Sequence, residues 1–199
     1  MRITRERMFP ICYMIVAVSF FGFVLENLWL LVTRGVMDNR NMRVPFLLGY
    51  GLGVAALYLV FGTPRNIRVM KGGALPLGVA YLMYFLFSAV AVTASELVLG
   101  LSVERLLGFV YWDYSRIPLN ITKYSSLPTS MGFGILITFF MDKCFEPMIA
   151  RFSRIEGRRS IVVSLGLLTL LTADMLWGYY TMYRLGGLNI LWQIRTPWA

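Results

Sequence analysis

The stretch Phe9–Thr33, FPICYMIVAVSFFGFVLENLWLLVT, decides the class of fold. It continues for about 25 residues, and a helix of about 20 apolar residues is long enough to cross a bilayer. The run is too long for the apolar core of a signal peptide, and no small-residue cleavage site follows it. We therefore predict that this segment is a retained first membrane helix.

Two polar residues, Glu26 and Asn27, lie in the second half of this run. A rise of about 1.5 Å per residue places Glu26 roughly 10 Å from the Thr33 end. An ionisable side chain at that depth either serves a function or locks helices together as a paired or protonated group, and the sequence leaves both open. Gly22 lies four residues earlier on the same face and leaves room for a neighbouring helix.

The whole chain has the composition of a membrane protein. Of its 199 residues, 58% are hydrophobic and 15% are charged, and the mean hydropathy is +0.66. We predict an all-α, polytopic integral membrane protein that forms a single membrane domain over residues 1–199, with a structured outer loop. About five transmembrane helices are expected, over residues 9–33, 45–62, 74–99, 127–149 and 161–183.

The distribution of basic residues predicts the orientation. We interpret the net charge of +9 as arginine facing anionic lipid on the cytoplasmic side, and not as a nucleic-acid surface. Outside the predicted spans, ten basic residues fall on the side of the N-terminus and eight on the other side. The ten lie in the head Met1–Arg7 and in the turns Thr63–Gly73 and Ala150–Ser160. We expect a multi-pass protein of the cell membrane with a cytoplasmic N-terminus.

Several kinds of chemistry are excluded by missing residues. The chain has no histidine, which removes a histidine base, a Ser–His or Cys–His nucleophile and imidazole metal sites. Cys12 and Cys144 each fall inside a predicted span and lack metal-ligand spacing. We predict no catalytic residue, no metal and no cofactor. The glycine-rich phosphate loop of ATPases is also missing, so any ATP hydrolysis must come from a separate subunit.

A polar stripe runs along the third predicted span. Ser88, Val92, Glu96, Gly100 and Glu104 recur every four residues, which places them on one helical face if the helix continues that far. Carboxylates accompanied by small residues avoid lipid. We therefore expect this face to contact protein or water.

The segment Val103–Ser130 mixes acids, aromatic residues and prolines between two apolar runs. Pro118 removes a backbone donor and restricts Ile117, so this segment is expected to form a structured connection at the membrane surface. Trp112 fits an interfacial aromatic belt. For Asp113 and Asn120 a turn role and a functional role stay equally open.

The cost of charge in a membrane suggests where these residues meet. Glu26 and Glu96 need partners, and Arg40 is the nearest cation along the chain, with a planar fork suited to a carboxylate. We predict one polar site near the outer surface, walled by aromatic rings. The expected substrate-binding residues are Glu26, Asn39, Arg40, Glu96, Glu104, Trp112, Asp113, Tyr114 and Asn120.

The arrangement of these residues resembles a known bacterial family, described as putative ABC-transporter type IV or CmpB-like permeases. The resemblance covers roughly residues 21–140, and its most specific part is the run Trp112-Asp113-Tyr114-Ser115 followed by Pro118 and Asn120. The residues that carry it are Glu26, Asn39, Arg40, Pro45, Gly49, Tyr50, Gly51, Glu96, Glu104, Trp112, Asp113, Tyr114, Ser115, Pro118, Asn120 and Ser130. Thr122-Lys123 stands where the family has Gly-Arg.

The resemblance implies a permease that moves or binds a small or amphiphilic substrate in the lipid bilayer. The expected partners are a separate ATPase subunit and, because five spans are few, a second copy of the chain or another membrane subunit. Two other classes stay open. One is a membrane enzyme acting on a lipid-linked substrate, with carboxylates as acid and base and Arg40 on a phosphate. The other is a non-catalytic scaffold subunit.

Overall fold

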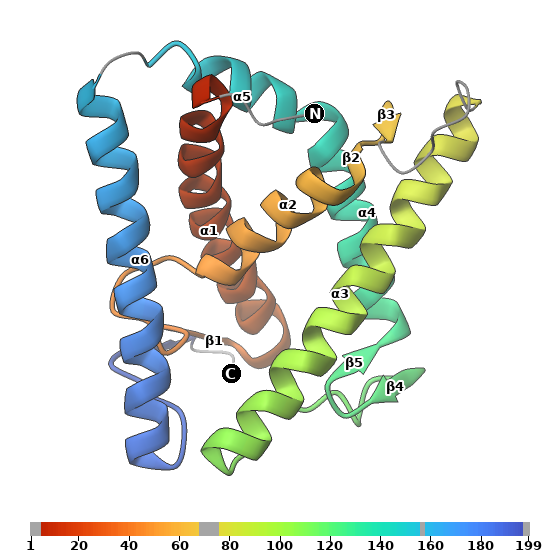
Figure 1. The fold of residues 1–199 in the computed structure, drawn as a ribbon. Helices are drawn as coiled ribbons and strands as arrows, with labels where there is room; N and C mark the ends of the chain where they lie inside the picture. The colour runs from red at the N-terminus through yellow and green to blue at the C-terminus, as the bar shows by residue number, and fades with distance from the viewer. Residues whose placement is uncertain (1–4, 68–75, 156–157, 197–199) are drawn as a thin grey trace. The chain divides into compact units, whose positions relative to one another are not determined.

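The structure is a computed structural model that describes residues 5–67, 76–155 and 158–196. Most of the described residues are in helices, so the predicted helical class is confirmed. The described helices are α1 (Arg5–Arg34), α2 (Leu48–Phe61), α3 (Leu77–Leu107), α4 (Leu127–Lys143), α5 (Phe145–Phe152) and α6 (Arg158–Leu185) (Figure 1). Parts of the predicted basic segments and of the third predicted span lie outside the described residues. These are Arg2, Arg68, Lys71 and residues 74–75.

Short strands connect the helices. They pair antiparallel as β1 (Val36–Asp38) with β6 (Gln193–Arg195), β2 (Gly62–Thr63) with β3 (Asn66–Ile67), and β4 (Asn120–Thr122) with β5 (Ser125–Ser126). The chain divides into two compact units. Unit 1 comprises the residues up to Ala55 and those from Met148 onward, and unit 2 comprises Ala56–Pro147.

Among the described residues, three helices are long and apolar enough to cross a membrane. These segments are Phe9–Arg34, Leu77–Leu107 and Arg159–Leu185. The helices at the second and fourth predicted spans are shorter, with 14 residues in α2 and 17 in α4. Since about 20 residues cross a bilayer without tilt, a total of about five membrane helices stays a prediction.

Two helix ends differ from the predicted spans. The helix expected to end near residue 99 continues to Leu107 and ends at Gly108, whose φ of 80° suits a left-handed cap. The fourth segment divides after Lys143. Pro147 explains this division, because in one continuous helix its ring would clash with the Lys143 carbonyl four residues earlier.

Unit 1 is built on α1 and α6. The buried residues of α6 are mostly small or apolar. At its first turn the Ser160 carbonyl accepts a hydrogen bond from the Tyr13 hydroxyl at 3.0 Å. A Cβ added at Gly22 would overlap the Tyr50 ring, and one at Gly51 would overlap the Ile15 carbonyl. Gly22 therefore admits a neighbouring helix as predicted.

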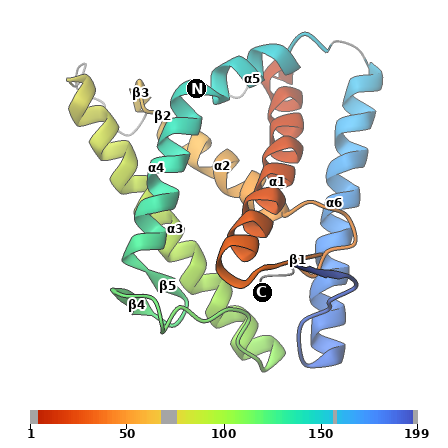
Figure 2. The same cartoon turned by 180° about the vertical axis from the view of Figure 1, so that it is seen from behind.

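Unit 2 is built on α3 and α4, which run side by side in both views (Figures 1 and 2). Gly134 of α4 lies against Phe85 and Ala89 of α3. The β4–β5 hairpin folds onto the C-terminal half of α3, where a Cβ at Gly100 would overlap the Tyr124 ring. This hairpin is the structured part of the connection that the sequence predicted.

Candidate functional site

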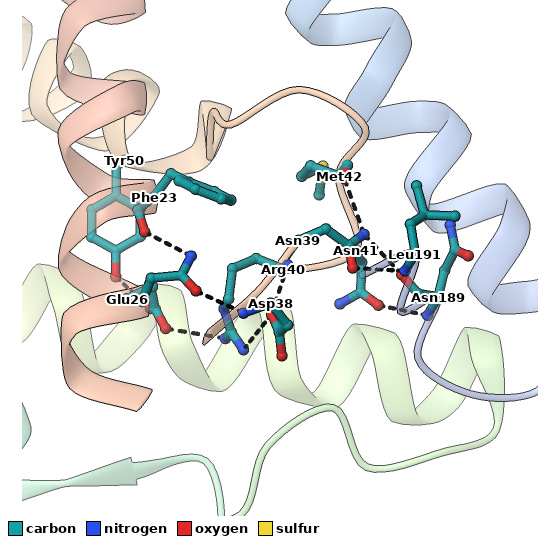
Figure 3. A network of polar contacts seen from close by, with 11 residues as sticks. Phe23, Glu26, Asp38, Asn39, Arg40, Asn41, Met42, Tyr50, Asn189 and Leu191 are labelled. Carbon is teal, nitrogen blue, oxygen red and sulfur yellow. Dashed lines mark hydrogen bonds and ion pairs between the residues drawn. The ribbon is translucent and has the colours of Figure 1, made fainter. Parts of the chain in front are cut away.

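The side chain of Glu26 forms the centre of a polar network in unit 1 (Figure 3). One carboxylate oxygen accepts a hydrogen bond from Arg40 Nη2 at 3.0 Å, and the other accepts one from the Tyr50 hydroxyl at 2.5 Å. The predicted pairing of Glu26 with Arg40 is therefore confirmed. Only 25% of the Glu26 side chain and 22% of the Arg40 side chain is exposed, so the charges are sheltered yet reachable.

Side-chain hydrogen bonds hold the loop that carries Arg40 in place. The side-chain oxygen of Asn27 accepts the Asp38 backbone N–H at 2.8 Å, and Asp38 accepts the Arg40 backbone N–H at 2.7 Å. The Asp38 carboxylate also lies 3.9 Å from the Arg40 guanidinium. Asn27 of α1 thus positions Asp38, and Asp38 in turn positions Arg40.

The buried Asn39 and Asn41 join the same loop to the segment that follows α6. Asn39 accepts the Leu191 N–H at 2.8 Å and donates to the Asn189 carbonyl at 3.0 Å. Asn41 accepts the Asn189 N–H at 2.7 Å. Asn39, predicted to contact substrate, therefore has a structural part in holding this loop.

The backbone of this loop is strained. Arg40 has a φ of 48° and Asn41 a φ of 64°, in the left-handed region that costs a residue with a side chain on the order of 1 kcal/mol. Asparagine tolerates this region, but arginine does not favour it. The hydrogen bonds of Asp38, Asn39 and Asn41 hold Arg40 in this conformation.

Asp174, a buried acid within the long apolar helix α6, has a structural role. Its buried carboxylate accepts the backbone N–H groups of Arg43 at 3.1 Å and Val44 at 3.3 Å. The Arg43 guanidinium lies over the Trp177 ring, 4.7 Å from its centroid. Asp174 therefore fixes the part of the loop that leads into α2.

A second polar cluster belongs to unit 2, where the predicted stripe of α3 faces protein. The Glu104 carboxylate accepts hydrogen bonds from Lys123 Nζ at 2.5 Å and from the Tyr124 hydroxyl at 2.6 Å. The hydrogen bond with Glu104 raises the pKa of Lys123. Glu96 accepts the Ser125 hydroxyl at 2.7 Å, and Ser125 adjoins Ser130 at 3.2 Å. The stripe thus contacts the β4–β5 hairpin.

The aromatic and acidic residues before the hairpin have mainly local partners. Trp112 donates from Nε1 to the Tyr124 carbonyl at 2.8 Å, and the backbone N–H of Tyr114 donates to the Lys123 carbonyl at 2.7 Å. Asp113 accepts the Ser115 N–H at 2.8 Å in an exposed turn, and hydrogen bonding from Ser115 lowers the pKa of Asp113.

Asn120, for which a turn role and a functional role were open, lies exposed on β4 of unit 2. The turn places Leu119, with a φ of 58°, so that its carbonyl accepts the Leu127 N–H at 3.0 Å. This closes the hairpin and leaves the Asn120 side chain outward.

The predicted site residues therefore fall into two groups, one in each unit. Glu26, Asn39 and Arg40 meet in unit 1, and Glu96, Glu104, Trp112, Asp113, Tyr114 and Asn120 belong to the hairpin region of unit 2. Sequence reasoning missed direct partners of the glutamates, namely Tyr50, Lys123, Tyr124 and Ser125. Tyr50 had a signal, because it stands between two glycines and opposite Gly22.

Comparison with known proteins identifies the family. The family model described as "Putative ABC-transporter type IV" matches residues 13–179. No curated protein and no solved structure matches the chain. The family match covers far more than half of the chain and includes every predicted site residue. The chain therefore belongs to this family of ABC-transporter-type, multi-pass membrane proteins.

Proposed function

We propose that this protein is the membrane subunit of a transport system whose ATP is hydrolysed by a separate subunit. Membership of the family supports the transport class, and the chain itself has no phosphate-binding loop. We place it in the cell membrane with a cytoplasmic N-terminus, about five spans and a second copy or another membrane subunit beside it. The substrate is a small or amphiphilic molecule with a polar group.

The ion pair of Glu26 and Arg40 carries the proposal. Glu26 lies inside one of the three long apolar helices, where a charge is costly unless it is paired. Replacing a buried ion pair by well-packed apolar residues is often neutral or stabilising, so stability alone is a weak reason for this pair. A sheltered but reachable guanidinium is instead suited to a carboxylate or phosphate on a substrate, which its fork engages with two hydrogen bonds.

The strained loop supports the same role. Substrate binding is stronger when the protein group is held in place beforehand, because less freedom is lost on binding. Arg40 is held in a left-handed conformation by partners on both sides. Backbone strain that is maintained by the surrounding structure is typical of binding sites.

We also propose that the polar residues around the β4–β5 hairpin of unit 2 contact substrate. Lys123 and Glu104 form a charged pair that is more exposed than the pair in unit 1. Lys123 supplies a positive charge at the position where the family has arginine. Its ammonium group is a compact point charge, whereas the arginine guanidinium is a planar fork. Glu96, Trp112, Asp113, Tyr114 and Asn120 remain proposed contacts on this surface.

The transport assignment is tested by purifying the tagged protein from its native membranes. The expected product contains a stoichiometric subunit with a phosphate-binding loop, and the complex hydrolyses ATP in lipid nanodiscs. Replacing the lysine of that loop should abolish hydrolysis. A chain that purifies without an ATPase subunit under mild detergent, while it retains its own activity on a lipid, would contradict the proposal.

The site assignment is tested in the same preparation by identifying co-purified small molecules by mass spectrometry. A charge-assisted hydrogen bond contributes about 1.5–3 kcal/mol, so Arg40→Gln should reduce the retained molecule at least about tenfold. Arg184→Gln, an exposed change in the last turn of α6, is the matched control and should retain it. Equal retention by both variants would exclude Arg40 from the site.

A further inference from the structure

An apolar groove lies between α3 and α4 in unit 2, away from the hairpin cluster. Its volume is about 400 Å³. Leu82 and Phe85 line it from α3, and Ile135 and Phe139 line it from α4. Three of these four side chains are exposed, so the groove opens outward along the two helices.

One end of the groove is charged. Asp142 and Lys143 line that end, and Asp142 binds Arg65 at 2.6 Å and Lys143 at 3.0 Å. The Asp142 side chain is only 2% exposed, whereas 60% of Arg65 and 56% of Lys143 is exposed. Together, Arg65, Lys143 and Asp142 carry a net charge of +1 at this end of the apolar groove.

Asp142 lies in the last turn of α4, yet its carboxylate is buried and not solvated. The β2–β3 turn brings Arg65 over the end of α4, and Tyr81 of α3 also hydrogen-bonds Asp142. Asp142 therefore fixes the side chains of both Arg65 and Lys143. Their outward sides remain available to a ligand, because a single carboxylate cannot satisfy all the donors of an arginine and a lysine.

We propose that this groove binds an anionic phospholipid, with one acyl chain along Leu82, Phe85, Ile135 and Phe139 and the phosphate at Arg65 and Lys143. The net charge of +1 complements the single negative charge of a phosphodiester. From Ile135 to Lys143 the helix rises about 12 Å. One leaflet of a bilayer has about 15 Å of hydrocarbon, so the groove matches the depth of one lipid tail.

The groove lies on the side that the charge count assigns to the cytoplasm. The β2–β3 turn belongs to a predicted inner segment, and the inner leaflet carries the anionic lipids. The inference is independent of the transported substrate. It requires that α3 and α4 meet lipid, with the Lys143 end of α4 at the inner surface.

The test is native mass spectrometry of the full-length protein with phosphatidylglycerol or phosphatidylcholine of equal chain length. Phosphatidylglycerol should bind more tightly. A basic residue near anionic lipid contributes about 1 kcal/mol, so Lys143→Gln should weaken phosphatidylglycerol binding about fivefold and leave phosphatidylcholine binding unchanged. Arg105→Gln, an exposed arginine in the last turn of α3, should change neither.

A second variant tests the apolar part. Ile135→Trp should fill the groove and weaken both lipids, while the melting temperature in detergent verifies that the variant is folded. Free glycerol phosphate should not displace the lipid, because it has no chain to fill the groove. Equal affinity for the two lipids, equal effects of Lys143→Gln and Arg105→Gln, or displacement by glycerol phosphate would each overturn the proposal.

Discussion

The two carboxylate oxygens of the single residue Glu26 bond different partners. Arg40 takes one oxygen and Tyr50 the other, so each carboxylate oxygen has a partner without any substrate. A ligand with an anionic group would compete for Arg40 and leave the Tyr50 bond intact. The two partners of Glu26 should therefore differ in their effect on binding and on stability.

Tyr50→Phe removes one neutral donor and keeps the ring that packs on Gly22. We expect it to reduce the free energy of unfolding by about 1 kcal/mol. Arg40→Gln should cost more, about 1–3 kcal/mol, because the sheltered carboxylate loses its charged partner. Denaturant unfolding in detergent micelles measures both. A larger loss for Tyr50→Phe than for Arg40→Gln would contradict this ranking.

A double-mutant cycle separates the ion pair from its surroundings. Glu26→Gln and Arg40→Gln alone should each lose the pair, so the double variant should lose less than the sum. We expect a coupling free energy between about 0.5 and 3 kcal/mol, the range for residues in direct contact. Additive losses within about 0.3 kcal/mol would show that the two side chains do not interact in the folded protein.

At the scale of elements, the hairpin and α3 are joined through a glycine. Gly100→Ala should force the Tyr124 ring away and cost about 1–3 kcal/mol, with loss of the Glu104 contact. Gly132→Ala in α4 is the matched control, since nothing lies within 4 Å of its added Cβ. Alanine is the better helix former there, so Gly132→Ala should stabilise by about 0.5–1 kcal/mol. Equal melting temperatures for the two variants would contradict this packing.

Element types followed well from sequence, but helix ends and partners did not. The apolar runs predicted every long helix, and the four-residue stripe on α3 predicted the face that meets the hairpin. The division at Lys143 was missed because hydropathy does not register one proline. The contact of Glu26 with Arg40 was predicted, but its contact with Tyr50 was not. A tyrosine contact depends on how the start of α2 packs against α1. Arg65 and Asp142 lie 77 positions apart, and no local pattern reveals such a pair.

At the scale of the whole molecule, the number of spans decides the topology. If α2 and α4 cross the membrane with the three long helices, Thr122 and Ser153 lie on opposite sides. Cysteines introduced at these two positions should then label with an impermeant maleimide from opposite faces of oriented vesicles. The native Cys12 and Cys144 are replaced by serine in the background. Labelling of both positions from one face would contradict the five-span topology.

The central claim is that Glu26 and Arg40 form a substrate site and not only a structural contact. The most direct test is the ATP hydrolysis rate of the purified complex per folded molecule, compared between the native protein and Glu26→Gln. The amide keeps the shape and removes the charge, so we predict at least a tenfold lower rate per folded molecule with the complex intact. A rate that falls only in step with the folded fraction would contradict the account and leave the pair as a structural contact.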